Sequence, residues 1–225
     1  MKVLTYHSIG YPPKGARLKT LYVKPSSFKR QVRLLKFLGF EFGTSESLFR
    51  RDKQKVVVLT FDDAYRDFYE NAFPFLVENN IKAIVFVPAG LVGQFNKWDY
   101  EKVRAIKPIM DWGQLKDLVD AGMEVGSHTI THPYLTRLPF AQAKEEIEGS
   151  KKLLEDKLGV EIRAFCYPYG DYNEQIRDMV AEAGYSVAYT TVSGSVEESP
   201  NFYEIRRVTV FGNDFLPKLL MKVLL

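Results

Sequence analysis

Two of the three histidines in this 225-residue sequence, His128 and His132, lie four residues apart, directly after a predicted strand at residues 123–126. Residues at this spacing face the same side of one helical turn, so two imidazoles can share a metal ion. Because histidine is so scarce here, we favour metal ligands over two structural histidines. Two histidines and one carboxylate make an open metal site that keeps positions for water and substrate.

Two neighbouring carboxylates, Asp62 and Asp63, follow the continuous apolar run of residues 56–61. Adjacent side chains point to different sides as a chain leaves a strand, so one acid can bind a cation while the other takes a proton. An aspartate between a strand and a helix is also a common N-cap, so the pair alone is compatible with a structural role.

Two further polar groups follow predicted strands. His7 comes after residues 2–6 and could protonate a leaving amine, although a lone histidine is as readily structural. The turn at Pro168 and Tyr169 comes after residues 162–167. Such a turn commonly has a purely structural role, but beside the other groups it could offer a backbone N–H and an aromatic wall to a sugar.

The elements that must position these groups follow a regular pattern. Apolar β-branched runs alternate with amphipathic stretches, which is typical of βα units around a mainly parallel sheet. Working residues of such sheets lie beyond the carboxyl ends of the strands, where all the groups above fall. We count about seven βα units without a linker or repeat, so we predict one barrel-like α/β domain over residues 1–225. The predicted strands are residues 2–6, 56–61, 81–87, 123–126, 162–167, 187–190 and 204–210.

The first predicted helix is capped by Ser26 or Ser27 and runs to Leu38. The other predicted helices span residues 65–79, 114–121, 140–158 and 174–183. Pro74 is expected to kink or split the helix at residues 65–79. Residues 88–108 form a long loop, and loops of that length tend to be functional. Residues 215–225 have one apolar helical face, which we expect to pack on the barrel, although it could also lie on a membrane.

The composition excludes several classes of protein. The 31 Lys and Arg residues nearly balance the 28 Asp and Glu residues, so we expect no nucleic-acid partner. A single cysteine excludes an internal disulfide. No run approaches the roughly 20 apolar residues of a membrane-spanning helix, and no cleavable signal is visible. We therefore expect a cytoplasmic location, or export if the sequence is a trimmed piece of a longer protein.

The charges are unevenly distributed along the chain. Residues 1–40 hold nine basic side chains and no acid. Such a stretch could make peripheral contact with an anionic membrane or a lipid-linked sugar. A solvated helix face explains it as well, and this is the interpretation that we favour.

Three segments together resemble the motifs of the NodB-type polysaccharide deacetylases, carbohydrate esterase family 4. They are Thr-Phe-Asp-Asp at residues 60–63, His-Thr-Ile-Thr-His at residues 128–132 and Tyr-Pro-Tyr-Gly at residues 167–170. The resemblance covers residues 56–190, and the combination is specific although each segment alone is not. It implies a distorted (β/α)7 barrel, in agreement with the count of βα units.

The resemblance also implies roles for the site residues. Asp62 becomes the general base that takes a proton from water during hydrolysis of an N-acetyl group. Tyr169, with Pro168, would contact the substrate and its oxyanion. The ligand set holds one divalent metal ion, zinc by default, although it also accepts iron, cobalt or nickel. The implied ligands are Asp63, His128 and His132.

The sequence departs from the family pattern at two places. Cys166 stands where the third motif usually has an arginine, and the usual C-terminal Leu-x-His motif is absent. Residues 4–7, however, look like the start of the branch that includes the poly-N-acetylglucosamine deacetylases, which implies His7 as the catalytic acid. Arg207, or its neighbour Arg206, resembles an arginine that recurs in this branch and would replace the missing charge beside the base.

The leading hypothesis is therefore a metal-dependent hydrolase that removes acetyl groups from an N-acetylated sugar of the N-acetylglucosamine type. One alternative is a carbohydrate-binding barrel that has lost catalysis, which the missing arginine favours and the intact ligand set opposes. Another is a hydrolase that uses Cys166 with His7, but nothing marks the thiol as activated. The sequence leaves open the oligomeric state and the glycan, which could be a free polymer, a peptidoglycan fragment or a lipid-linked intermediate.

Overall fold

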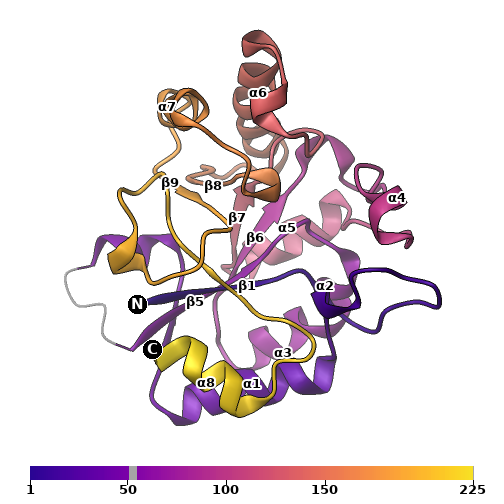
Figure 1. Cartoon of the computed structure of the whole chain (residues 1–225), viewed down its shortest axis with the longest axis vertical. Helices are drawn as coiled ribbons and strands as arrows, with labels where there is room; N and C mark the ends of the chain where they lie inside the picture. Colours follow the sequence, from indigo (N-terminus) through magenta and orange to yellow (C-terminus); the bar gives the residue numbers. More distant parts are fainter. Residues whose placement is uncertain (51–54, 225) are drawn as a thin grey trace.

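A parallel sheet forms the centre of the computed structural model, which describes residues 1–50 and 55–224. Seven strands follow one another in the order β10–β1–β5–β6–β7–β8–β9, and every pair along this path is parallel (Figure 1). They are β1 (Lys2–Tyr6), β5 (Val56–Phe61), β6 (Ile84–Val87), β7 (Glu124–Ser127), β8 (Ala164–Cys166), β9 (Val187–Tyr189) and β10 (Val208–Thr209).

The two ends of this path approach each other. The amide N–H of Ala188 in β9 donates to the carbonyl of Phe202 at 2.8 Å, and that of Thr190 donates to Ile205 at 2.9 Å. The chain then enters β10, which pairs with β1. The sheet is therefore curled into the distorted (β/α)7 barrel that the sequence predicts. That residues 1–225 form one domain stays a prediction.

Three short strands lie outside the seven-strand path. β4 (Glu41–Gly43) pairs with the first half of β5, while β2 (Ser8–Ile9) and β3 (Tyr22–Val23) form a separate pair. The sequence did not indicate them, because a segment of two or three residues is too short to show the alternation of apolar and polar residues that marks a strand. They matter for the site because β2 directly follows His7.

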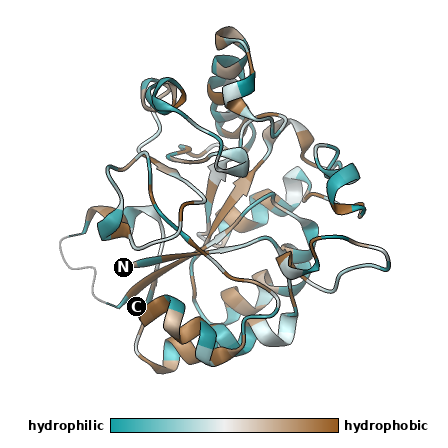
Figure 2. Ribbon diagram, in the orientation of Figure 1, coloured by the Kyte–Doolittle hydropathy of each residue, from teal (hydrophilic) through white to brown (hydrophobic). Residues whose placement is uncertain are grey.

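Helices surround the sheet (Figure 1). Figure 2 shows the hydrophobic colour concentrated along the strands and mixed with polar residues on the helices, as expected for elements with one solvent-facing side. All six residues of β5 are buried, which explains its continuous apolar run. The helices are α1 (Pro25–Phe37), α2 (Arg66–Asn71), α3 (Phe73–Glu78), α4 (Tyr100–Val103), α5 (Trp112–Asp120), α6 (Phe140–Leu158), α7 (Glu174–Glu182) and α8 (Leu216–Leu224).

Several predicted boundaries are wrong. Helix α1 begins at Pro25, whose fixed φ and missing N–H suit the first helical position, so Ser26 and Ser27 lie inside it and do not cap it. The predicted helix 65–79 is split, as expected from Pro74, and the break falls at Ala72. The strands predicted at 81–87 and 204–210 shorten to β6 and β10. Ile205 and Val210 lie outside β10 although their amides still donate to the carbonyls of Ala188 in β9 and Thr5 in β1.

The C-terminal helix α8 packs against α1 (Figure 1). Its own residues Leu219 and Val223 are buried, as expected from its apolar face, while Met221 and Leu224 remain exposed. Leu225, the last residue of the predicted apolar stretch, lies outside the described residues. Within residues 1–50 and 55–224, the structure has no helix with the length and hydrophobicity required to cross a membrane.

Candidate metal and catalytic site

A pocket of about 390 Å³ opens at the carboxyl ends of β1, β5 and β7. Its floor carries the polar groups singled out from the sequence, and its walls are largely aromatic. The floor residues are His7, Asp62, Asp63, His128 and His132, and the aromatic walls comprise Tyr22, Tyr65, Trp98, Tyr134, Tyr167 and Tyr169.

Three buried side chains converge on the floor of this pocket. Nε2 of His132 lies 3.3 Å from Oδ1 of Asp63, and Nε2 of His128 lies 3.6 Å from the same oxygen. The donor atoms of the three residues all lie within 4.8 Å of one another. Asp63 comes from the end of β5, and the histidines come from the end of β7, so the segments on either side of β6 build one cluster that could bind a metal ion.

The protonation states of Asp63 and His128 suit a divalent cation. Nδ1 of His128 lies 2.7 Å from the carbonyl oxygen of Cys166, which can only accept, so the ring proton sits on Nδ1 and the lone pair of Nε2 faces Asp63. Burial lowers the pKa of His128 to about 4, which keeps the imidazole neutral. Burial alone would raise the pKa of Asp63, but hydrogen bonding and charge interaction with His132 outweigh it and hold this pKa well below its usual range. At neutral pH the cluster therefore offers the anionic oxygen of Asp63 and the neutral imidazole of His128.

The backbone between the two histidines is not the helical turn expected from their spacing. Thr129 and His132 have φ values of 66° and 63°, in the left-handed region that costs energy for residues with a side chain. This irregular turn still brings the two imidazole centres to 4.6 Å, at an angle of 81°. The structure thus corrects the local geometry and keeps the predicted proximity.

A glutamate from helix α6 holds this turn in place. Glu146 accepts hydrogen bonds from the amides of Ile130 and Thr131, each at 2.8 Å. It also accepts one from the hydroxyl of Thr131 at 2.5 Å. The carboxylate therefore replaces the backbone partners that a regular turn would have supplied.

Asp62 is held by a buried arginine, and one of its carboxylate oxygens lies within 4.8 Å of a ring nitrogen of His128. Nη1 and Nη2 of Arg207 donate to the two carboxylate oxygens of Asp62 at 2.7 and 2.8 Å, a bidentate pair. Arg207, 1% exposed, is thus the arginine that reaches Asp62, while the neighbouring Arg206 is not. Burial would raise the pKa of Asp62, but the charge and hydrogen bonds of Arg207 hold it below its ordinary value. Neither Asp62 nor Asp63 caps α2, which has Tyr65 at its N-cap.

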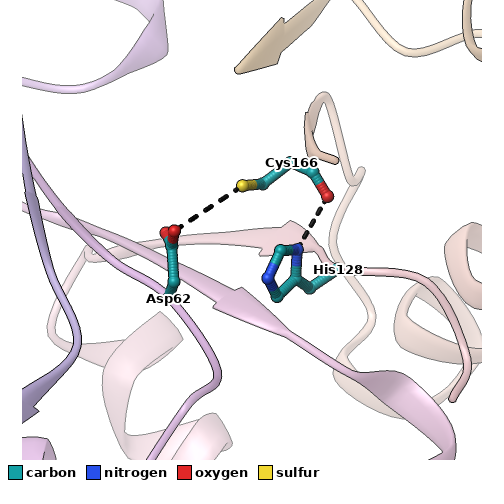
Figure 3. A group of neighbouring side chains, drawn as sticks. All are labelled: Asp62, His128 and Cys166. Carbon is teal, nitrogen blue, oxygen red and sulfur yellow. Dashed lines mark hydrogen bonds between the residues drawn. The ribbon is translucent and has the colours of Figure 1, made fainter. Parts of the chain in front are cut away.

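Cys166 lies between the carboxylate and the histidine, as Figure 3 shows. Its Sγ is 3.8 Å from Oδ2 of Asp62 and 3.1 Å from Nη2 of Arg207, while its carbonyl oxygen binds His128. Burial raises the pKa of the Cys166 thiol well above its usual value. A neutral, buried thiol is a poor nucleophile, which argues against a hydrolase built on Cys166.

His7 also lies on the pocket floor. Its Nδ1 is buried and has no hydrogen-bond partner among the described residues. Burial lowers the pKa of His7, and the charges of Asp62 and Asp63 act in the opposite direction.

The two residues predicted to contact substrate occupy different places. Tyr169, whose φ of 60° is left-handed, sets its ring edge-on to His132 at 4.6 Å and stacks on Tyr134 at 3.9 Å. Pro168 is buried behind this turn and is not one of the described residues that line the pocket. Tyr169 thus forms part of the wall, and Pro168 shapes the turn that presents it.

Sequence reasoning did not single out several residues of the pocket wall. Trp98 stacks on the His132 ring at 4.6 Å and 24°, and Asp99 and Lys107 also face the pocket. All three lie in the long predicted loop of residues 88–108. The length of that loop was the signal that could have found them.

A buried Asp/His/His cluster at the mouth of a parallel α/β barrel defines a site of the kind that holds a catalytic metal. The sequence model of the polysaccharide deacetylase family matches residues 49–188. The chain therefore belongs to this family.

Individual relatives cover nearly the whole chain. The deacetylase PplD of Streptococcus pyogenes, solved in complex with acetate, is 28% identical, with a TM-score of 0.85 over 99% of this chain and 97% of that one. IcaB of Ammonifex degensii is 26% identical, with a TM-score of 0.83 over 98% of this chain and 95% of that one. A poly-beta-1,6-N-acetyl-D-glucosamine N-deacetylase of Staphylococcus aureus is 25% identical over 212 residues, 88% of this chain and 71% of that protein.

Proposed function

We propose that the protein is a metal-dependent hydrolase that removes N-acetyl groups from a glycan of the N-acetylglucosamine type. The observation that carries this proposal is the convergence of Asp63, His128 and His132 beside an aspartate held by Arg207. Membership of the polysaccharide deacetylase family supports the reaction, and the named activity of the staphylococcal relative supports the sugar.

The metal would be held by Asp63, His128 and His132, with zinc as the first expectation and iron, cobalt or nickel as other ions that this ligand set accepts. When bound, such an ion supplies a Lewis acid that polarises the acetyl carbonyl and makes water more acidic. Trp98 and Tyr169 pack on the His132 ring and fix its orientation toward the other ligands.

Asp62 acts as the general base in this proposal. Its carboxylate accepts a proton from the attacking water, and Arg207 keeps it ionised and oriented for that purpose. The bidentate pair fixes both carboxylate oxygens, so the base cannot rotate away from the pocket. Arg207 acts as a positioning residue, because it contacts Asp62 and is buried away from the pocket lining.

His7 donates a proton to the departing amine. The imidazole lies in the same pocket as Asp62, and its Nδ1 has no hydrogen-bond partner among the described residues. The aromatic walls, with Tyr169 and Tyr134 stacked on each other, provide flat apolar surfaces for a sugar ring. The backbone N–H of Tyr169 is our candidate for an additional donor to the oxyanion.

A test of this proposal combines metal analysis with mass spectrometry of the product. We expect the protein to bind about one equivalent of zinc and to remove acetyl groups from a neutral N-acetylglucosamine oligomer. Asp63→Ala should lose both metal and activity, whereas Asp120→Ala, a change at an exposed aspartate paired with Lys116, should lose neither. Metal-loaded protein that binds the oligomer without releasing acetate would instead support the carbohydrate-binding alternative.

A further inference from the structure

Lys107 is a buried cation that has no role in the proposed reaction. Its side chain lines the pocket, and the residue is only 8% exposed. Its Nζ lies 2.9 Å from the centre of the Tyr65 ring and 5.1 Å from that of Tyr22. Among the described residues, no carboxylate lies within ion-pair distance of this ammonium.

An ammonium in this position is costly for the fold. A buried charge without a partner is strongly unfavourable, and burial lowers the pKa of Lys107 to about 8 although Asp67, Asp63 and Asp99 act in the opposite direction. The three carboxylates are themselves engaged. Asp63 belongs to the metal cluster, Asp67 accepts from the Ile9 amide, and Asp99 accepts from Asn96 at 2.7 Å. The ammonium therefore faces a pocket in which a ligand can supply the missing anion.

Two exposed cations stand at the rim of the same pocket, Arg17 and Lys102. The segments that carry them are tied together, because the amide of Arg17 donates to the carbonyl of Val103 at 2.7 Å. Ala16, Val103 and Ala105 form a small buried cluster beneath this contact. The rim cations are thus held on one side of the pocket by ordered structure.

The charges of the pocket lining do not balance once a divalent ion is bound. Asp62 is neutralised by Arg207, and Asp63 is a ligand of the ion, so Asp99 is the one remaining carboxylate of the described lining. Asp99 would then face the three cations Arg17, Lys102 and Lys107 together with the charge of the bound metal. The local potential therefore favours an anion at this end of the pocket.

We propose that Lys107, with Arg17 and Lys102, forms a subsite for a phosphate or carboxylate group on the N-acetylated sugar, so that the preferred substrate is an anionic glycan. This inference rests on the proposed deacetylase function and narrows its substrate class. Lys107 provides the buried, direct contact, and the two rim cations attract the group and orient it.

The experiment compares three N-acetylglucosamine substrates of equal length: one neutral, one with a phosphate monoester and one with a lactyl carboxylate on the same sugar. We expect kcat/KM of the metal-loaded protein to be at least about tenfold higher for one of the anionic substrates than for the neutral one. The phosphate and carboxylate arms show which source of the anion is used. The preference should weaken with added salt.

Lys107→Met should reduce the ratio of anionic to neutral kcat/KM about tenfold, mainly through KM, and should melt at the same or a higher temperature because an unpaired charge is removed. Lys97→Met, a change at an exposed lysine of the same loop that lies over Phe95, should leave the ratio unchanged. If Lys107→Met does not fold, the double variant Arg17→Gln with Lys102→Gln should reduce the same ratio.

Equal kcat/KM values for all three substrates would overturn the proposal of an anion subsite. A Lys107→Met variant that lowers the turnover of neutral and anionic substrates alike would overturn it too. Both results leave the deacetylase function standing. If no substrate loses acetyl, the deacetylase function fails. In that case, calorimetric titration with the phosphorylated and the neutral sugar still tests whether Lys107 binds the anion.

Discussion

Asp62 and Asp63 are neighbours in the chain, yet their environments give them different properties. Asp63 faces two imidazoles, and Asp62 faces a guanidinium. Both carboxylates have a lowered pKa, but only the oxygens of Asp63 share a cluster with both His128 and His132. The different roles that we propose for the two acids therefore follow from the direction in which each leaves strand β5.

Replacing Asp62 by asparagine should separate catalysis from metal binding. Asp62→Asn keeps the shape of the side chain but removes the base, so we expect kcat to fall by about 100-fold or more with the metal content unchanged. Elemental analysis and acetate release measure the two quantities. Full activity of a metal-loaded Asp62→Asn protein would show that another group takes the proton.

Arg207 should affect the rate without touching the substrate. We expect Arg207→Met to lower kcat more than it raises KM, and to shift the acid limb of the pH–rate profile upward, because Asp62 loses the charge that lowers its pKa. Arg206→Met is the matched control, since Arg206 does not contact Asp62. A pH profile that does not move would mean that Arg207 has a purely structural role.

His7 can be tested in the same way. His7→Ala removes the proton donor, so we expect turnover to fall by about 100-fold while the metal content stays constant. A leaving group that needs no proton, as in an activated acetyl ester, should recover much of the loss. Unchanged turnover on the amide would remove His7 from the reaction.

At the scale of elements, the site depends on irregular segments that regular elements hold in place. The turn of residues 128–132 contains two left-handed residues, neither of them glycine, and helix α6 fixes it through Glu146.

We expect Glu146→Ala to weaken metal affinity about tenfold, because the imidazoles lose their fixed positions. Glu148→Ala, on the exposed side of the same helix, is the control. Competition with a chelator measures the affinity, and equal values for the two variants would contradict this role.

The same segments mark the limit of what sequence reasoning could predict. Strand β5 is predicted to its end residues, because its apolar run is continuous and buried. The proximity of His128 and His132 was predicted with the wrong local geometry, since nothing in those residue types indicates a positive φ. Arg207 was linked to Asp62 only by family resemblance, and Lys107 was missed, because contacts between distant segments leave no spacing pattern.

At the scale of the whole molecule, Asp214 ties the end of the sheet to the last helix. Its buried carboxylate accepts from the Phe211 amide at 2.9 Å and pairs with Lys218 and Lys222 of α8. Burial would raise the pKa of Asp214, but these partners outweigh it and lower the pKa. Because the carboxylate is more acidic in the folded state, its stabilising contribution is present above the unfolded pKa of about 4 and is lost as the pH falls through the lower, folded value.

We therefore expect Asp214→Asn to reduce the free energy of unfolding by about 2 kcal/mol at pH 7, and the difference from the unsubstituted protein to shrink as the pH falls below about 4. Urea unfolding at a series of pH values measures this difference. Asp178→Asn, a change at an exposed aspartate on α7, should cost much less. A penalty for Asp214→Asn that stays constant down to pH 2 would contradict the assignment.

The first strand, β1, is hydrogen-bonded to the last one, β10, with Leu4 opposite Val208. His7 follows one of these strands, and Arg207 precedes the other. The three side chains proposed to bind the metal all lie within residues 63–132, whereas the guanidinium that holds Asp62 comes from residue 207. We expect a substitution that disrupts the pairing of β1 with β10 to withdraw Arg207 from Asp62, and thus to impair the proposed base more than the proposed metal cluster.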